Sequence, residues 1–174
     1  MKRLISYLMV IALLIGCVGM LTACGSKSDA YVLPEGYTMY TDEYITFAYP
    51  AHWTTTSSSV AMLQNTENTN NITIAYEAAT DLYSNLTAEA FIADLQPSLE
   101  SVGMQVSDVS VTQLTRGDTD MTEIRFNVVL MDVSMTQTLY ALTVSDRTYI
   151  VTTTEVVSEP AIAENIYASL RAVE

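Results

Sequence analysis

Large apolar or aromatic residues alternate with small ones along residues 45–49, where the sequence reads ITFAY. This alternation predicts a strand with Ile45, Phe47 and Tyr49 on one face, because successive side chains of a strand point to opposite sides. We expect the strand to end at Pro50, since proline has no backbone N–H to donate to a sheet. Trp53 then begins the next extended piece.

Further stretches have the composition of strands. VAMLQN at residues 60–65 and NITIAYEA at 71–78 flank the asparagine-rich NTENTNN, which we interpret as turn chemistry rather than as a functional site. Four more strands are predicted later in the chain, at residues 109–114, 122–131, 135–144 and 148–156. Their connections, near Gly117, Asp132 and Asp146, are short, so we expect these four strands to form an antiparallel meander.

Apolar residues recur at the spacing of a helix along residues 87–102. Thr87 can cap this helix, Glu89 lies near the positive end of the helix dipole, and Gly103 can terminate the helix. One stripe collects the apolar residues that we expect to pack on a sheet, namely Phe91, Ile92, Leu95, Leu99 and Val102. Pro97 removes one backbone hydrogen bond, so we expect a kink or a break there.

A second helix is predicted near the end of the sequence. It begins at Glu159 and Pro160, since proline is favoured near the first helical position. Its buried stripe consists of Ile162, Ile166, Leu170 and Val173. Strands, a helix, more strands and a closing helix, with antiparallel pairing, define an α+β layer fold. The predicted fold is therefore an antiparallel β-sheet flanked by helices.

The first residues have the layout of an export signal. Lys2 and Arg3 precede an apolar run at residues 4–23, and the polar residues 25–29 follow. An uncleaved membrane anchor is the alternative, because a helix of about 20 residues can span a bilayer. LTAC at residues 21–24 favours cleavage, because it resembles the bacterial lipobox, in which a lipid-modified cysteine becomes the mature N-terminus.

Cys24 is the predicted lipid-attachment site. Cys17 also fits the lipobox pattern, but cleavage there would leave the apolar residues 18–23 at the head of the mature chain. Cleavage before Cys24 instead leaves residues 24–30, which contain glycine and serine, as a tether between the lipid and the domain. We therefore predict a signal peptide at residues 1–23 and a protein held at the cell membrane, outside the cytoplasm, by its acyl chains.

Composition restricts the classes of partner. Removing residues 1–23 removes two of the seven basic residues and none of the twenty acidic ones, which leaves a formal net charge of −15. A domain as acidic as residues 31–174 should repel nucleic-acid phosphates, so no nucleic-acid partner is expected. The domain contains no cysteine, so it can form no internal disulfide, and its length is sufficient for one hydrophobic core.

Two motifs resemble those of the PsbP/DcrB-like superfamily. YITFAYPAHW at residues 44–53 is similar to the strand and turn that open these domains, and ENIYASLRAV at 164–173 is similar to their terminal helix. The order of elements between them also matches, so the resemblance covers residues 31–174. It implies a PsbP-like αβα sandwich and an accessory or assembly protein at a membrane. It carries over no catalytic residue, because the matched Tyr49 and Trp53 look structural.

The sequence of the domain lacks the residue patterns of several common catalytic mechanisms. The domain has no cysteine nucleophile, and no lysine follows Lys27 that could activate a serine. A serine–histidine–aspartate triad would need His52, the only histidine, which lies in the turn between Pro50 and Trp53. No GxSxG elbow presents a serine, and one histidine without cysteines does not suggest zinc. We therefore interpret His52 as an exposed turn residue and predict no catalytic site and no cofactor.

Asp118 and Asp120, in the sequence GDTD, are weak candidates for a calcium site. The remaining acidic ladder and the distal glutamate of an EF-hand loop are missing. Two solvated acids of a hairpin turn explain the pair without an ion, so no metal is predicted. The preceding RGD at residues 116–118 is a tripeptide that occurs often by chance.

Aromatic residues crowd the front of the domain, at Tyr31, Tyr37, Tyr40, Tyr44, Phe47, Tyr49 and Trp53. They could form a contact surface for a glycan or a protein, or they could fill the core and lie singly on the surface. We expect Phe47, Tyr49 and Trp53 to be core residues. For Tyr37, Tyr40 and Tyr44 both interpretations stay open.

The sequence thus predicts a lipid-anchored, extracytoplasmic binding or accessory protein that acts on a membrane-proximal protein partner. A small-ligand or cation-binding lipoprotein is the alternative, and an exported hydrolase is the weaker one. A deep apolar cavity with a few converging polar groups would favour the ligand-binding alternative.

Overall fold

The computed structural model describes residues 31–57, 61–101, 103–116, 118–130, 132–159 and 161–173. The predicted signal peptide, the tether, Cys24 and the alternative Cys17 lie outside these residues. In the part of the chain that is described, no helix is long and apolar enough to cross a membrane.

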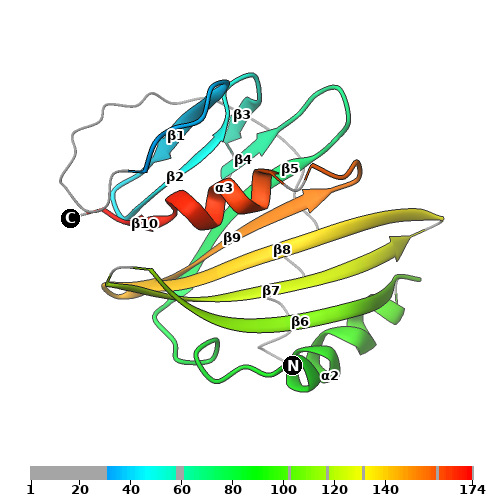
Figure 1. Ribbon diagram of the computed structural model, residues 1–174. Coiled ribbons are helices and arrows are strands. Elements are labelled where there is room, and N and C mark those ends of the chain that lie inside the picture. The colour runs from blue at the N-terminus through cyan, green and yellow to red at the C-terminus, as the bar shows by residue number, and fades with distance from the viewer. Residues whose placement is uncertain are drawn as a thin grey trace.

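A large antiparallel sheet forms the centre of the domain (Figure 1). Its strands follow one another in space in the order β3-β4-β5-β9-β8-β7-β6. They are β3 (Thr54–Ser57), β4 (Ala61–Gln64), β5 (Asn71–Ala78), β6 (Gln105–Arg116), β7 (Thr119–Leu130), β8 (Val133–Val144) and β9 (Arg147–Glu155). The predicted meander is confirmed, because β6, β7, β8 and β9 pair in sequence order and antiparallel.

A smaller sheet has the order β1-β2-β10, with β1 at Tyr37–Thr41, β2 at Ile45–Pro50 and β10 at Arg171–Ala172. The helices α2 (Ala88–Glu100) and α3 (Ala161–Ser169) complete the described fold. Figure 1 shows α2 on one side of the large sheet and α3, with the small sheet, on the other. The predicted α+β class, an antiparallel sheet flanked by helices, is confirmed.

Two clusters of buried apolar side chains hold these layers together. The cluster on the α3 side contains Ile45, Phe47 and Tyr49, which the alternating pattern placed on one face of a strand. Trp53 belongs to the same cluster and is only 5% exposed, so the predicted core role of these aromatic residues is confirmed. Burial of this apolar surface is the main force that stabilises the layers.

The helix predicted at residues 87–102 is present as α2. Thr87 caps it, because its hydroxyl group accepts a hydrogen bond from the Ala90 N–H at 3.2 Å. Of the expected kink or break at Pro97, the break is wrong, since the helix runs without interruption to its last residue. Leu95 and Leu99 are both buried, so packing holds the helix on either side of the proline.

The end of the sequence differs from the prediction of one continuous helix. Ile162, Ile166 and Leu170 are buried as predicted, but α3 ends at Ser169. Arg171 and Ala172 then pair with β2, whose free edge offers unpaired backbone groups. Val173 therefore lies outside the helical stripe.

β6 begins at Gln105, four residues before the predicted start. The pairing of β6 with β7 shifts between Ser107 and Ser110, and Asp108 there has a φ of +54°. This irregularity is a β-bulge, which places two residues of one strand opposite one of its neighbour. The bulge interrupts the alternation of side chains, so the sequence pattern hid the first part of the strand.

Candidate functional site

Four side chains meet beside the turn between β8 and β9. They are Tyr44, Tyr76, Arg147 and Tyr149, and we call them the tyrosine–arginine cluster. The guanidinium carbon of Arg147 lies 4.5 Å from the centroid of the Tyr44 ring and 4.6 Å from that of Tyr76. The Tyr149 ring centroid lies 5.9 Å from that of Tyr44 and 5.7 Å from that of Tyr76. These distances are typical of cation–π and aromatic contacts.

The strand pairing explains how this cluster forms. Arg147 opens β9 directly after the turn, and Tyr149 lies two residues further along the same face of the strand. Tyr76 is the partner of Tyr149 on the adjacent strand β5. Tyr44 comes from the turn between β1 and β2, so the cluster connects the small sheet to the large one.

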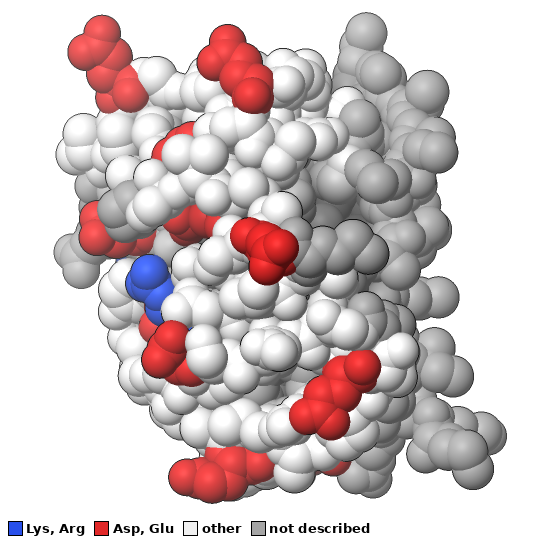
Figure 2. All heavy atoms as spheres, turned by 90° about the vertical axis from the view of Figure 1, so that its right-hand side faces the viewer, with Lys and Arg blue, Asp and Glu red and all other residues white. Residues whose placement is uncertain are grey.

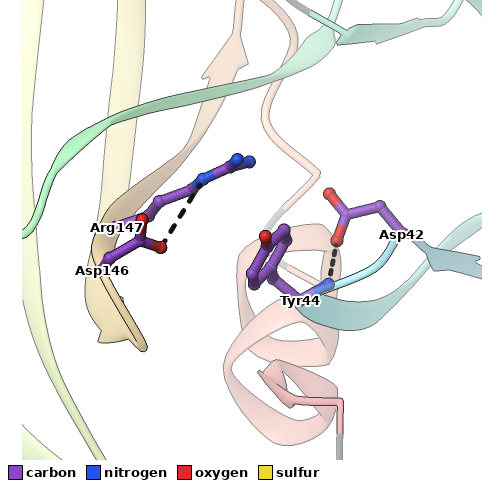
Figure 3. A network of polar contacts seen from close by, with 4 residues as sticks. All are labelled: Asp42, Tyr44, Asp146 and Arg147. Carbon is purple, nitrogen blue, oxygen red and sulfur yellow. Dashed lines mark hydrogen bonds and ion pairs between the residues drawn. The ribbon is translucent and has the colours of Figure 1, made fainter.

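Two carboxylates flank the cluster (Figure 3). Oδ1 of Asp42 accepts hydrogen bonds from the backbone N–H groups of Tyr44 at 2.8 Å and Ile45 at 2.9 Å, which fixes the β1–β2 turn. Oδ1 of Asp146 lies 3.9 Å from Nε of Arg147. Figure 3 shows the Arg147 side chain extending from β9 toward Tyr44 and Asp42. Arg147 therefore lies between two acidic groups.

The cluster has a buried base and an exposed rim. Tyr149 is 2% exposed, whereas Tyr76 is 58% exposed and is the most exposed large aromatic side chain of the described residues. A side-chain hydrogen bond with Tyr149 raises the pKa of Arg147 above its ordinary value, so the guanidinium group stays charged at physiological pH. The exposed part combines an aromatic ring with a permanent positive charge.

The front tyrosines divide between core and surface. Tyr40 stacks on Phe47 with ring centroids 5.0 Å apart and donates a hydrogen bond to Oδ2 of Asp42 at 3.2 Å. Tyr37 is half-buried in β1, and Tyr44 belongs to the cluster. Tyr76 did not stand out in the sequence, because it alternates with the apolar Ile72 and Ile74 in an ordinary strand pattern. Arg147 was also missed, although arginine is rare in this acidic chain.

A pocket of about 800 Å³ lies where residues 79–84 pass over the ends of β6 to β9. Asp118 and Asp120, the two weak calcium candidates, both line it together with Asp81. Asp120 accepts a hydrogen bond from the Thr115 hydroxyl group at 2.7 Å. Within the described residues, no three histidine, cysteine, aspartate or glutamate side chains are grouped to hold a metal ion. The pocket thus brings the two candidate acids together with Asp81.

The remaining candidate residues lie elsewhere. His52 is exposed in the turn between β2 and β3. Arg116, from the RGD sequence, donates a hydrogen bond from its guanidinium group to the Tyr167 carbonyl oxygen at 2.9 Å. Its guanidinium carbon also lies 6.0 Å from the centroid of the Tyr31 ring. Because Arg116 is engaged with α3, it is not freely presented for recognition.

Acidic groups are spread over the surface. Figure 2 shows one face of the molecule, on which aspartate and glutamate side chains are scattered and basic side chains are scarce. This distribution agrees with the strongly negative charge of the sequence. A field of this sign attracts cationic partners and repels anionic ones.

Comparison with solved structures identifies the fold. The solution structure of cyanobacterial PsbP (CyanoP) from Synechocystis sp. PCC 6803 superimposes with a TM-score of 0.60 at 12% sequence identity, over 86% of this chain and 98% of that chain. A crystal structure from Bacteroides thetaiotaomicron VPI-5482 gives a TM-score of 0.49 at 12% identity, over 75% of this chain and 45% of that chain. No protein-family model and no curated protein matches the sequence. The chain has a PsbP-like α+β fold, as its sequence motifs predicted.

Proposed function

We propose that this protein is a lipid-anchored, extracytoplasmic accessory protein that binds a membrane-proximal protein partner through the tyrosine–arginine cluster. The observation that carries the proposal is the exposed Tyr76 ring beside the Arg147 guanidinium group. Tyrosine and arginine are among the residues that contribute most binding energy at protein interfaces. The resemblance to the PsbP/DcrB-like superfamily supports an accessory role.

The cluster is held in a fixed position before any partner binds. Tyr149 is buried in the core, and Asp42 fixes the turn that carries Tyr44. A partner that binds such a surface orders few side chains, and a smaller loss of conformational entropy favours affinity. Rigid presentation on strands and tight turns therefore supports a binding role for Tyr76 and Arg147.

Charge restricts the chemistry of the partner. Asp42 and Asp146 flank Arg147, and the domain as a whole is strongly acidic. A partner surface with basic residues around an apolar or aromatic centre would complement this arrangement. We therefore propose a protein with a positively charged contact surface.

The predicted anchor places the interaction near the membrane. Lipid on Cys24 would tether the domain through residues 24–30. The six residues 25–30, as a flexible chain, span only about 12–15 Å, so the domain would stay close to the bilayer surface. The partner would then be an integral membrane protein or another protein attached to the same membrane.

Site-specific photo-crosslinking tests the proposal. A photoreactive amino acid replaces Tyr76 in the full-length protein, in cells that naturally produce it, and crosslinked species are identified by mass spectrometry. Val157 is the matched control position, because it is 51% exposed and lies in the connection between β9 and α3. We expect one dominant crosslinked membrane protein from position 76 and none from position 157.

A second variant separates binding from folding. Tyr76→Ser removes the exposed ring and should abolish co-purification of the crosslinked protein while the thermal unfolding of the domain stays unchanged. The same crosslinked products from both positions, or no product from position 76, would contradict the proposed surface.

A further inference from the structure

The pocket beneath residues 79–84 results from a change of side-chain size along one face of the large sheet. Farther from the turns, this face of β7, β8 and β9 carries the large buried residues Ile124, Leu139 and Ile150. Toward the turns, the same face carries the small residues Thr122, Ala141, Thr143 and Thr148, all of which line the pocket. Large side chains fill the space between α2 and the sheet, whereas the small ones leave it open.

The roof of the pocket is fixed at both ends. At one end, the Ala79 N–H donates to the Asp146 carbonyl oxygen at 2.9 Å, and the Thr80 N–H donates to the Thr148 hydroxyl oxygen at 3.0 Å. At the other end, the Tyr83 carbonyl oxygen accepts a hydrogen bond from Nε2 of Gln113 at 3.0 Å. The pocket is therefore formed before a ligand enters, as is usual for small-molecule sites.

The charge of the lining selects the class of ligand. Asp81, Asp118 and Asp120 contribute three carboxylates, and no lysine, arginine or histidine lies among the described lining residues. An anion, or the carboxylate of a zwitterion, would face like charge here. The lining therefore favours a ligand that carries only positive charge.

Apolar side chains define the shape of that ligand. The lining also contains Ala79 and Ala141, and at its margin Val144 and Ala172, the latter from β10. The aromatic residue of the lining, Tyr83, is only 3% exposed, so its ring offers no open platform for a sugar. Methylene segments fit against such a surface, while ammonium groups at intervals reach the carboxylates.

The geometry points to a binding site for a linear aliphatic polyamine in this pocket. Its ammonium groups pair with Asp81, Asp118 and Asp120, and its methylene segments pack on the alanine and valine side chains. The floor of the site lies on the opposite face of β9 from the tyrosine–arginine cluster, because Thr148 alternates with Arg147 and Tyr149. Val144, which packs against the core cluster on the α3 side, belongs only to the margin of the pocket. Polyamine binding is therefore a property beyond the proposed protein contact, and either can fail without the other.

Isothermal titration calorimetry tests the site with spermidine as the probe. The full-length protein is purified in detergent micelles and titrated at physiological ionic strength. We expect one saturable site per chain. The double variant Asp118→Asn/Asp120→Asn should weaken binding at least tenfold, because both positions are exposed and the change removes charge without disturbing the core.

A matched variant controls for overall charge. Asp94→Asn/Glu164→Gln removes the same formal charge from exposed helix positions that do not line the pocket. Its dissociation constant should stay within twofold of the wild type. Equal weakening in both double variants would show diffuse attraction to an acidic surface and would overturn the site.

Filling the pocket is an independent test. Thr143→Phe, at an exposed position of β8, places a large side chain on the floor and should abolish spermidine binding. If this variant fails to fold, the aspartate variants decide the question. Absence of saturable spermidine binding to the wild type, or binding of the neutral 1,4-butanediol as tightly as of putrescine, would contradict the proposal. Complete displacement of spermidine by equimolar calcium would also contradict it.

Discussion

Asn70 and Glu159 are joined by a hydrogen bond of 3.1 Å from Nδ2 to Oε1, although 89 residues separate them. Oδ1 of the same asparagine accepts from the backbone N–H groups of Val156 at 2.8 Å and Val157 at 3.1 Å. Asn70 is completely buried. Its amide group therefore satisfies the backbone of the segment between β9 and α3, which has no strand partner there.

Asn70→Ala should lower the free energy of unfolding by about 1–3 kcal/mol, because the substitution removes the hydrogen bonds that this completely buried side chain makes with the segment between β9 and α3. Urea denaturation of wild type and variant measures the difference. Asn71→Ala is the control, since the Asn71 side chain makes only an exposed hydrogen bond to the Thr69 carbonyl oxygen at 3.2 Å. Equal stability of the two variants would contradict the role of Asn70.

The asparagine-rich loop illustrates the limits of sequence analysis. Its composition correctly predicted a turn between two strands, because asparagine side chains bond to nearby backbone groups, as Asn65 does with the Glu67 N–H at 2.9 Å. The contact of Asn70 with the β9–α3 segment was not predictable, since nothing in a local pattern specifies a distant partner. The loop therefore forms local turns and also makes a tertiary contact with the segment between β9 and α3.

The difference between local and distant contacts also explains which parts of the fold were predicted and which were missed. Strands with regular alternation, such as β2 and β5, were located within one residue of their bounds. β10 was missed because its two residues follow directly on a helical pattern and are held by pairing with β2. The tyrosine–arginine cluster was only partly foreseen, because pairing of β5 with β9 brings Tyr76 to Tyr149. Such non-local pairing leaves no periodic signal in the sequence.

Trp53→Ala should destabilise the domain by about 3–5 kcal/mol, as loss of a buried aromatic side chain usually does. Trp53→Phe should cost less, because the buried indole Nε1 has no hydrogen-bond partner among the described residues. Thermal and urea unfolding measure both variants. A Trp53→Ala protein with unchanged stability and lost partner binding would instead place Trp53 in an interface.

His52→Ala is the matched change at the neighbouring position. His52 is exposed, so the free energy of unfolding should change by no more than about 0.5 kcal/mol. Complementation of a deletion strain at matched protein levels should show unchanged function. Loss of function with a preserved fold would support a histidine-dependent reaction and contradict the non-enzymatic proposal.

Alkaline pH should unfold the protein through its buried tyrosines. Burial, with nearby Glu123, raises the pKa of Tyr140, and burial with nearby Asp42 raises that of Tyr40. Tyrosines of the unfolded chain lose their protons near pH about 10, while the folded state keeps them. The unfolded state then binds fewer protons, so stability should fall as the pH rises beyond about 10.

Urea denaturation at a series of pH values between about 8 and 11 measures this loss. Tyr140→Phe removes one of the responsible hydroxyl groups and should make the decline shallower, although it also removes the hydrogen bond to the Ala163 carbonyl oxygen at 3.0 Å. Tyr76→Phe, at a site that is 58% exposed, is the control and should follow the wild type. Parallel curves for all three proteins would contradict the assignment.

Cys24→Ser should block lipid attachment and leave an uncleaved precursor. Detergent-phase partitioning and mass spectrometry of the N-terminus measure both effects. Cys17→Ser is the control, and it should leave processing intact. The reverse result, with Cys17 required and Cys24 dispensable, would move the mature N-terminus to residue 17.

The small sheet also affects the order of folding. β2 obtains one neighbour, β1, from the residues just before it, but the other, β10, comes from near the end of the described chain. The edge of β2 that faces β10 therefore stays unpaired until Arg171 and Ala172 reach it. Such long-range pairing slows folding, and an unpaired edge is open to other chains in the meantime. Until Arg171 and Ala172 pair with it, this edge of β2 is therefore a place where the folding chain could add a strand from another molecule.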